Sequence, residues 1–336
     1  MKTMETAPLV SVILPVYNDA AHIRRAIDSV LKQSYSNLEL IVWNDGSTDS
    51  TEEIVRSYGD PRLKYHSGDN RGVSYARNRA FQLSHGQLVA FQDSDDEWMD
   101  GKLTAQVKVM DAHPEIDLLF TDYLSLAGGN QQRPRAIFEI CSRAMKLLDL
   151  ELAEEGLCTV KGGIAESLAV DCYVGDSTVI LRREVLEKAG CFNTRIRSSV
   201  GFEFFWRMGL YGVRFAYLDR VCMKRYKYPG SLSSAGVANC RNRLVALDAC
   251  LQESTAKGRT DLIACLRPRY RNAWHNMISA CGAGGDLRGM LRAFRESTRY
   301  GLRPGAFCLV AKAVWQQAKQ PDRRAGGLYQ GSKAAR

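Results

Sequence analysis

The stretch Leu88-Val89-Ala90-Phe91-Gln92-Asp93-Ser94-Asp95-Asp96 decides how this chain folds. Its apolar first half is typical of a buried strand, and three carboxylates follow where that strand ends. Open α/β sheets bind ligands outside the carboxyl ends of their strands. Mg²⁺ and Mn²⁺ prefer carboxylate ligands and complete their shells with phosphate oxygens and water. The stretch therefore predicts a divalent-cation site made of Asp93, Asp95 and Asp96 that faces a nucleoside diphosphate.

An alternative interpretation makes the same stretch a turn that caps the helix expected near Lys102. Three neighbouring carboxylates repel one another, whereas one acidic side chain is enough to cap a helix. A bound cation relieves that repulsion, so the metal site is favoured over the cap.

Strand and helix patterns alternate over the first 125 residues. Strands are expected at Val10–Leu14, ending at Pro15, and at Leu38–Trp43, with helices around Ile23–Leu31 and Ser74–Ser84. Such alternation with short connections predicts a mainly parallel α/β sheet with helices on both faces. The first strand is not followed by the G-x-G-x-x-G pattern of dinucleotide sites, which argues against NAD or FAD.

Asp45 follows the second strand and should lie at the same sheet edge as Asp93. Its carboxylate could accept a hydrogen bond from the ring N–H of a pyrimidine base. It could equally form an Asx turn before Gly46. The residue pattern alone leaves both interpretations open.

Composition bounds the class of protein. The chain has 336 residues, of which 45% are hydrophobic and 25% charged, as in ordinary globular proteins. No apolar run reaches the roughly 18 residues of a membrane-spanning helix. The ten cysteines all lie from Cys141 onward and form no C-x-x-C pair, which favours reduced thiols in a cytoplasmic protein over a zinc site.

Charge is distributed unevenly along the chain. Residues 1–224 carry a net charge of −5 and residues 225–336 carry +14, which together give the overall +9. This asymmetry predicts an acidic catalytic part followed by a basic part with an anionic partner. No zinc-finger or RNP-type motif is present, so a membrane surface or lipid phosphate is favoured over nucleic acid.

Five blocks of sequence, in order, resemble the family 2 glycosyltransferases, which have the GT-A (Rossmann-like) fold. The blocks cover about 90 residues, and together they are far more specific than a lone D-x-D. They are Val10–Asn18, Leu31–Tyr35, Glu39–Asp49, Asn70–Gly72 with Ala76–Asn78, and Phe91–Asp96. A weaker resemblance continues through Thr178–Leu186 and Gly190–Phe192 to Tyr226–Ser233.

The resemblance implies an inverting, nucleotide-sugar-dependent enzyme of polysaccharide or cell-surface glycan synthesis that uses Mg²⁺ or Mn²⁺. By analogy the donor would be a UDP- or dTDP-sugar, and the acceptor a glycan or a lipid-linked molecule. The cation would be held by Asp95, with Asp96 as a second candidate because the acidic turn permits either register. The nucleotide sugar would be bound by Pro15, Tyr17, Asp45, Arg77 and Asp93, where Arg77 has the alternative of a solvated helix residue.

One departure from the family pattern concerns the catalytic base. The family usually carries a Glu-Asp pair a few residues before the arginine numbered Arg207 here, and those positions hold Val200 and Gly201. Glu203 is the acid nearest to them, so it is predicted to be the base, with an ion pair to a nearby arginine as its alternative. Asp176 is the second candidate. If neither acts, the chain would be a sugar-nucleotide-binding protein that regulates or scaffolds a polysaccharide-synthesis complex.

The expected organisation is a GT-A domain over residues 8–235, with a nucleotide-sugar half at 8–125 and an acceptor half at 126–235. A basic helical extension at 236–320 and a disordered tail at 321–336 would follow. Helices are expected around Arg241–Leu251, Asp261–Cys281 and Asp286–Tyr300. Arg288, Arg292, Arg295 and Arg299 form a stripe on the third, either solvated or in peripheral contact with the inner face of a membrane.

Overall fold

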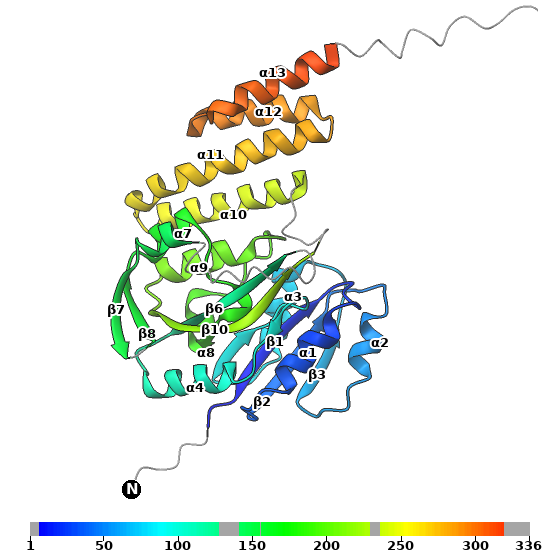
Figure 1. Cartoon of the computed structure of the whole chain (residues 1–336), viewed down its shortest axis with the longest axis vertical. Helices are drawn as coiled ribbons and strands as arrows, with labels where there is room; N and C mark the ends of the chain where they lie inside the picture. Colours follow the sequence, from blue (N-terminus) through cyan, green and yellow to red (C-terminus); the bar gives the residue numbers. More distant parts are fainter. Residues whose placement is uncertain (1–6, 128–140, 155, 229–235, 319–336) are drawn as a thin grey trace, which may run out of the picture.

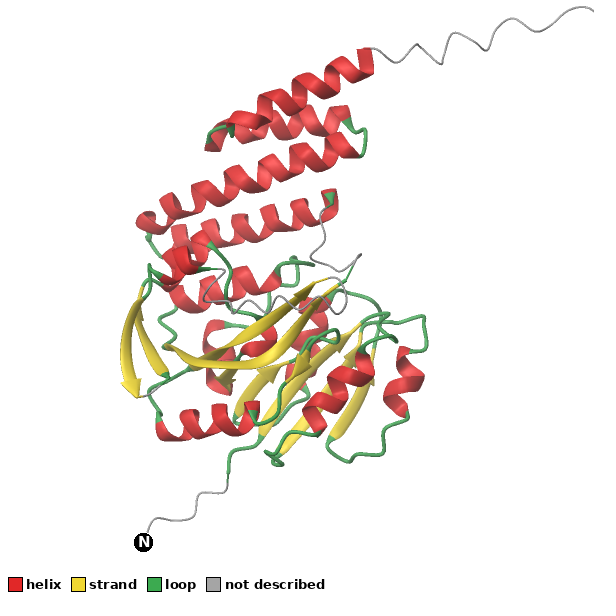
Figure 2. Cartoon of the chain, viewed as in Figure 1, coloured by secondary structure: helices red, strands yellow, loops and turns green. Residues whose placement is uncertain are grey.

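The computed structural model describes residues 7–127, 141–154, 156–228 and 236–318. The predicted disordered tail at 321–336 lies outside these ranges. Within them, a twisted sheet forms the centre of an α/β part, and a stack of helices rises from one side of it (Figures 1 and 2). The strands follow the order β3-β2-β1-β4-β9-β6-β10-β8-β7, with β5 paired to β10. The predicted α/β fold with a GT-A-type sheet is confirmed.

The four N-terminal strands are parallel, and every residue of β1, β2 and β4 is buried. Continuous apolar runs suit strands that are covered on both faces. Parallel pairing brings their carboxyl ends to one edge, which becomes the floor of the site. The elements are β1 (Val10–Val16), α1 (Ile23–Leu31), β2 (Leu38–Asn44), α2 (Thr51–Arg56), β3 (Leu63–Ser67), α3 (Val73–Gln82) and β4 (Leu88–Phe91).

The first strand does not end at Pro15, as the sequence predicted. It continues to Val16, with Pro15 opposite Trp43 of β2. Pairing between β1 and β4 ends at Ile13 opposite Phe91. Proline lacks the N–H that a central strand needs, but at this position no strand remains on the β4 side to receive one.

The next segments complete the sheet with mixed pairing. β10 runs parallel to β6, whereas β9 is antiparallel to both β4 and β6, between which it lies. The hairpin of β7 and β8, which the sequence analysis did not identify, extends the far edge. The elements are β5 (Glu97–Trp98), α4 (Lys102–Ala112), β6 (Leu118–Ala127), α6 (Ser142–Met145), β7 (Asp149–Glu154), β8 (Leu157–Gly162), α7 (Ile164–Val170), η1 (Asp176–Thr178), β9 (Ile180–Arg182), α8 (Arg183–Ala189), α9 (Val200–Leu210) and β10 (Phe215–Lys227).

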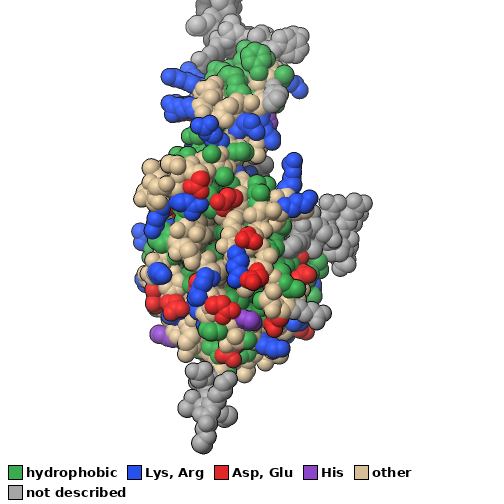
Figure 3. Space-filling model, turned by 90° about the vertical axis from the view of Figure 1, so that its left-hand side faces the viewer, with side chains coloured by type: hydrophobic (Ala, Val, Ile, Leu, Met, Phe, Trp, Pro, Cys, Tyr) green, Lys and Arg blue, Asp and Glu red, His purple; other side chains and the backbone are tan. Residues whose placement is uncertain are grey.

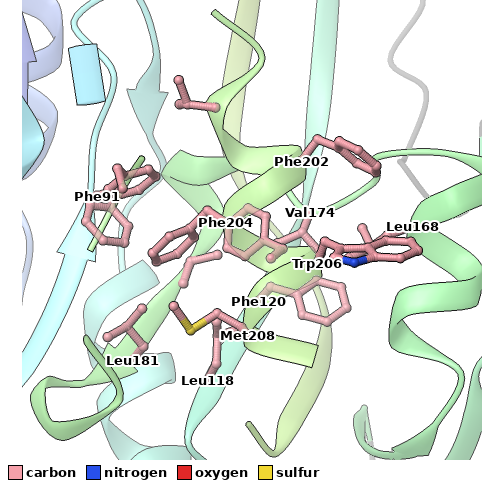
Figure 4. Packing of buried hydrophobic residues seen from close by; sticks show 14 of the residues in the cluster. Phe91, Leu118, Phe120, Leu168, Val174, Leu181, Phe202, Phe204, Trp206 and Met208 are labelled. Atoms are coloured by element: carbon pink, nitrogen blue, oxygen red, sulfur yellow. The ribbon is translucent and has the colours of Figure 1, made fainter. Parts of the chain in front are cut away.

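Helix α9 is almost wholly buried, from Val200 to Met208. Phe204 stacks on Phe192 with ring centroids 4.1 Å apart, and it meets Phe91 of β4 edge-on at 6.0 Å. Figure 4 shows this aromatic packing between the helix and the sheet. Such contacts fix both the position and the rotation of a helix. The first turn of α9 is thereby held beside the acidic turn that follows β4.

The helical extension consists of α10 (Val237–Ala256), α11 (Thr260–Ala283), α12 (Leu287–Ser297), η2 (Thr298–Tyr300) and α13 (Pro304–Ala318). The three helices predicted in this region are confirmed. α10 packs on α9 and α11 packs on α7, and the remaining helices follow outward from the sheet (Figure 1). None of the helices in the described ranges is both long and apolar enough to cross a membrane.

Candidate active site

A cleft of about 1200 Å³ opens at the carboxyl ends of β1, β2 and β4. It runs from these strands past η1 and the start of α9 to α10 and α11. Its volume suits a nucleotide together with a second substrate. The structure brings together in its lining eight of the predicted site residues: Pro15, Tyr17, Asp45, Arg77, Asp93, Asp95, Asp96 and Asp176.

The acidic turn after β4 has the geometry of a cation site. One oxygen from each of Asp93, Asp95 and Asp96 can be chosen so that all three lie within 4.8 Å of one another. Burial, followed by the charges of Asp93 and Asp19, raises the pKa of Asp95 to about 6. Burial also raises the pKa of Asp96 well above its usual range. Acids held this close without a cation are destabilised in their charged form, so the cluster fits Mg²⁺ or Mn²⁺.

The two candidate metal ligands differ in their surroundings. Asp96 is only 4% exposed, and its Oδ2 accepts a hydrogen bond from Ser177 Oγ at 2.7 Å. Asp95 is less buried, and its carboxylate receives a hydrogen bond from its own backbone N–H rather than from a buried side chain. A cation entering from the cleft would therefore meet a freer carboxylate at Asp95, which favours this register over Asp96.

Asp45 joins two loops of the cleft. Its Oδ1 accepts a hydrogen bond from the backbone N–H of Arg71 at 3.0 Å, and its Oδ2 accepts one from Gly72 at 2.7 Å. Gly46, with φ of +78°, lies so close to this second loop that an added Cβ would be 2.8 Å from Asn70 N. Asp45 is thus more than a local turn residue, because it positions the loop opposite the end of β1.

Arg77 is buried between two carboxylates. Its Nη2 lies 2.5 Å from Asp93 Oδ1, and its Nη1 lies 2.7 Å from Asp176 Oδ2. Burial alone would lower the pKa of the guanidinium, but Asp176 and Asp93 outweigh burial and raise it. At 2% exposed, Arg77 is not a solvated helix residue, so that alternative is wrong. Its charge orients Asp93 at the edge of the metal site.

Several residues that hold the acidic turn were not predicted from the sequence as residues of the site. Arg25 Nη2 donates to the carbonyl of Asp95 at 2.8 Å and to Tyr228 Oη at 3.1 Å. Its guanidinium lies 3.9 Å from the ring centre of Tyr226, and His22 stacks on Tyr228 at 4.1 Å. The alternating aromatic residues of Tyr226-Lys227-Tyr228 were the available signal, since alternation places two rings on one face of a strand.

Arg225 is a half-buried cation that sequence reasoning missed. It lines the cleft on β10. Burial alone would lower its pKa, but Tyr123, Asp96 and Asp93 raise it. A fixed positive charge beside the acidic turn can stabilise the negative charge of a phosphate bound there.

Glu203 does not line the cleft. It is 2% exposed, and its Oε1 accepts a hydrogen bond from Arg207 Nε at 2.7 Å. Arg207 in turn donates to the carbonyls of Gly190 and Cys191 at 3.0 and 2.6 Å, and so ties α9 to the end of α8. The ion-pair interpretation describes Glu203 correctly. Its role as the base stays a prediction, and its burial beside Arg207 and its absence from the cleft lining weigh against that role.

The far end of the cleft is basic. Arg243 of α10 and Arg269 of α11 both line it, together with Arg197. Burial lowers the pKa of Arg269, Cys172 and Asp171 oppose that shift, and the charge of Arg243 adds a little to it. Three arginines that line one end of a cleft can bind an anionic ligand there.

Comparison with known proteins bears on the fold and the family. Segments of 103–119 residues match three glycosyltransferases. The identity is 43% with the UDP-Glc:alpha-D-GlcNAc-diphosphoundecaprenol beta-1,3-glucosyltransferase WfgD of Escherichia coli and 42% with the putative teichuronic acid biosynthesis glycosyltransferase TuaG of Bacillus subtilis. It is 40% with an uncharacterised glycosyltransferase of Rickettsia typhi. The matching segments cover 30–35% of this chain and only 37–42% of those relatives.

Solved structures resemble this one over most of its length. Staphylococcus aureus TarS 1–349 in complex with UDP-GlcNAc gives a TM-score of 0.58 at 20% identity, covering 92% of both chains. The mannosyltransferase PcManGT from Pyrobaculum calidifontis, in complex with GDP-Man and Mn²⁺, gives 0.52 at 18% identity, covering 95% of this chain and 83% of that one. At such identities the likeness concerns the fold.

The family model for glycosyl transferase family 2 matches residues 11–188, more than half of the 336 residues. The matched region contains the acidic turn, Asp45, Arg77 and Asp176. The chain belongs to glycosyl transferase family 2.

Proposed function

We propose that this protein is a metal-dependent glycosyltransferase that moves a sugar, with inversion, from a nucleoside-diphosphate donor to an acceptor in cell-surface glycan synthesis. The observation that carries the proposal is the acidic turn at the carboxyl end of β4, which faces a cleft large enough for two substrates. The names of WfgD and TuaG, which refer to a lipid-linked glycan and to teichuronic acid, support this class of acceptor.

The donor would lie across the edge formed by β1, β2 and β4. Tyr17 is 50% exposed at this edge and offers a ring face to the base, while Pro15 and Asp45 border the same space. Asp95, with Asp93 and Asp96 beside it, would hold Mg²⁺ or Mn²⁺, which as a Lewis acid stabilises the departing diphosphate. Arg77 keeps Asp93 in place. A uridine or deoxythymidine nucleotide is the proposed carrier, and the UDP-GlcNAc complex of TarS supports it.

The acceptor would enter from the basic end of the cleft. Arg243 and Arg269 suit a phosphate or diphosphate, and the guanidinium of Arg269 also lies 4.4 Å from the ring centre of Phe202. A lipid-linked diphosphate therefore fits this end better than a neutral glycan does.

The proposal is tested by incubating the purified protein with a panel of nucleotide sugars, with Mn²⁺ or with a chelator, and measuring released nucleoside diphosphate. Release with one donor that disappears with the chelator is expected. A non-catalytic sugar-nucleotide-binding protein is the alternative, and it would bind the donor in calorimetry without releasing product. Absence of both binding and release with every donor would remove the proposal.

We also propose peripheral contact of the helical extension with the inner face of an anionic membrane. Arg288, Arg292, Arg295 and Arg299 are all exposed. Exposed apolar residues lie on the same outer helices and the segment joining them: Leu291, Leu302, Phe307 and Val314. On the face drawn in Figure 3, basic and apolar side chains occupy the upper helical part, and acidic ones occur only below it. Such a mixture suits anionic lipid headgroups.

Sedimentation with liposomes tests this contact. Binding to anionic liposomes, but not to neutral ones, is expected for the full chain. Replacing the four arginines by glutamine should abolish it. Replacing Lys32, Arg56 and Lys161, exposed cations of the α/β part, should leave it intact. Equal sedimentation of both variants would contradict the proposed surface.

A further inference from the structure

Gly201 occupies a position where a glycine needs an explanation. It lies in the first turn of α9, inside a buried helix, where glycine is less favourable than alanine. Its φ is not in the left-handed region, so the backbone does not require it. A Cβ added at residue 201, however, would lie 2.4 Å from Asp176 Oδ1 and 3.3 Å from Asp176 Cγ. The glycine leaves room for a carboxylate that another segment supplies.

The two oxygens of the Asp176 carboxylate have different neighbours. Asp176 is the first residue of η1, and its Oδ2 is held by Arg77 Nη1 at 2.7 Å. Its Oδ1 lies against Gly201, and in the described part of the chain no donor is within hydrogen-bond distance of it. Asp176 lines the cleft, and its side chain is 15% exposed.

The location of Asp176 along the cleft is also informative. Through Arg77 it is joined to Asp93, at the donor end. On its other side Asp176 lies against Gly201, and the next residue, Phe202, has its ring centre 4.4 Å from the guanidinium of Arg269 at the acceptor end. A group that accepts a proton from the acceptor hydroxyl has to lie between these two ends.

We infer that Asp176 supplies from η1 the carboxylate that the family pattern places at residue 201, and that its Oδ1 is the base of the transfer reaction. The inference rests on the proposed function. As the acceptor oxygen bonds to the anomeric carbon, the bond from that carbon to the phosphate oxygen breaks. The nucleoside diphosphate leaves with the electron pair, and the hydroxyl proton passes to Asp176 Oδ1.

The rival explanation is that Asp176 only neutralises Arg77 and so positions the donor site. The two explanations differ in the kinetic parameter that they affect. A base acts in the chemical step, so Asp176→Asn should lower kcat by about 10²–10⁴-fold and leave donor affinity within a few fold. A positioning residue would weaken donor affinity, and kcat at saturating donor would be largely kept.

A pair of exchanged residues makes the test sharper. Asp176→Ser removes the carboxylate, and Gly201→Asp alone would force two carboxylates into contact, so each single variant should be inactive. The double variant Asp176→Ser with Gly201→Asp returns one carboxylate to the same space from α9, and it should regain at least tenfold over Asp176→Ser. Glu203→Gln, in the same helix, is the control and should not change kcat.

The measurements are donor affinity by calorimetry, with nucleotide and Mn²⁺, and initial rates of nucleotide release with the donor that the wild-type protein uses. An unchanged kcat in Asp176→Asn would overturn the inference, and so would a loss of donor affinity large enough to explain the whole fall in rate. In either case the activity of the wild-type protein would leave the proposed function standing. If the double variant folds, binds donor and stays as inactive as Asp176→Ser, residue 201 is not equivalent to residue 176. A wild-type protein without donor binding would end both proposals.

Discussion

The acidic turn after β4 and the first turn of α9 border the same cleft, and the family pattern leads one to expect carboxylates at both. The first region supplies them from a single strand end, as Asp93, Asp95 and Asp96. The second holds Val200 and Gly201, and the carboxylate beside it comes from Asp176 in η1. The comparison teaches that the carboxylate beside a given turn can come from a distant segment of the chain, so that contacts in space, and not position in sequence, decide which acids border a site.

The largest effect is expected from Asp95→Asn, which tests the first region. The change removes one charge and preserves size, so a cation would lose its freest ligand. Metal stabilisation of a leaving group is worth several kcal/mol, and we expect kcat/KM to fall on the order of 10³-fold. Asp69→Asn, at an exposed carboxylate outside the cleft, is the control. Full activity of Asp95→Asn together with an inactive Asp96→Asn would move the metal site to the other register.

Arg77→Met tests the charge that links the two regions. It would leave Asp176, whose side chain is 15% exposed, and the half-buried Asp93 without their shared cation. Removing one partner of a buried ion pair lowers the free energy of unfolding by about 3–5 kcal/mol, and a loss of this size is expected in urea denaturation. Arg79→Met, in the same helix, should change stability much less. Equal stability of both variants would show that the link between the regions is weak.

Glu203→Gln tests Glu203, the acidic residue that follows Gly201 by two positions in the sequence. The amide can still accept from Arg207, but the charge-assisted bond is lost, so we expect stability to fall by about 1–3 kcal/mol. Turnover of the folded protein should not change, because Glu203 lies outside the cleft. A large fall in kcat without loss of stability would restore Glu203 as the base and would remove the contrast between the regions.

Local sequence was enough for the first region. Strand, turn and carboxylates are consecutive from Leu88 to Asp96, and parallel pairing then places Asp45 at the same edge. The family is confirmed, and so is the α/β fold. The site assignments themselves stay predictions, although the cleft gathers all of them except Glu203.

The second region could not be predicted in the same way. Whether Asp176 reaches Gly201 depends on how β9 and α8 return the chain to the sheet, and on how the aromatic residues of α9 fix its rotation. Sequence proximity instead favoured Glu203, whose position four residues before Arg207 is the spacing of an ion pair within one helix. A pattern search along the chain finds neighbours in sequence, and the carboxylate beside Gly201 comes from a neighbour in space.

Lys102 lies outside the cleft, so the smallest effect on activity is expected there, and its substitution tests how far paired charges matter for stability outside these regions. It starts α4, and in the described part of the chain its Nζ has only neutral partners: it donates to Gln106 Oε1 at 2.6 Å and lies 3.9 Å from the ring centre of Trp98. Burial lowers the pKa of Lys102 from 10.5 to about 7.

Between pH 7 and pH 10.5 the unfolded chain binds more protons at Lys102 than the folded chain does, so the free energy of unfolding rises with pH over this range. Below pH 7 Lys102 is charged in both states, and its buried charge opposes folding in full. Lys102→Met should therefore gain melting temperature relative to wild type as the pH is lowered from 9 to 6, whereas the exposed Lys108→Met in the same helix should show a difference that does not depend on pH. Parallel melting curves for both variants across this range would mean that the Lys102 ammonium stays solvated, and that an unpaired charge is tolerated here because it is not truly buried.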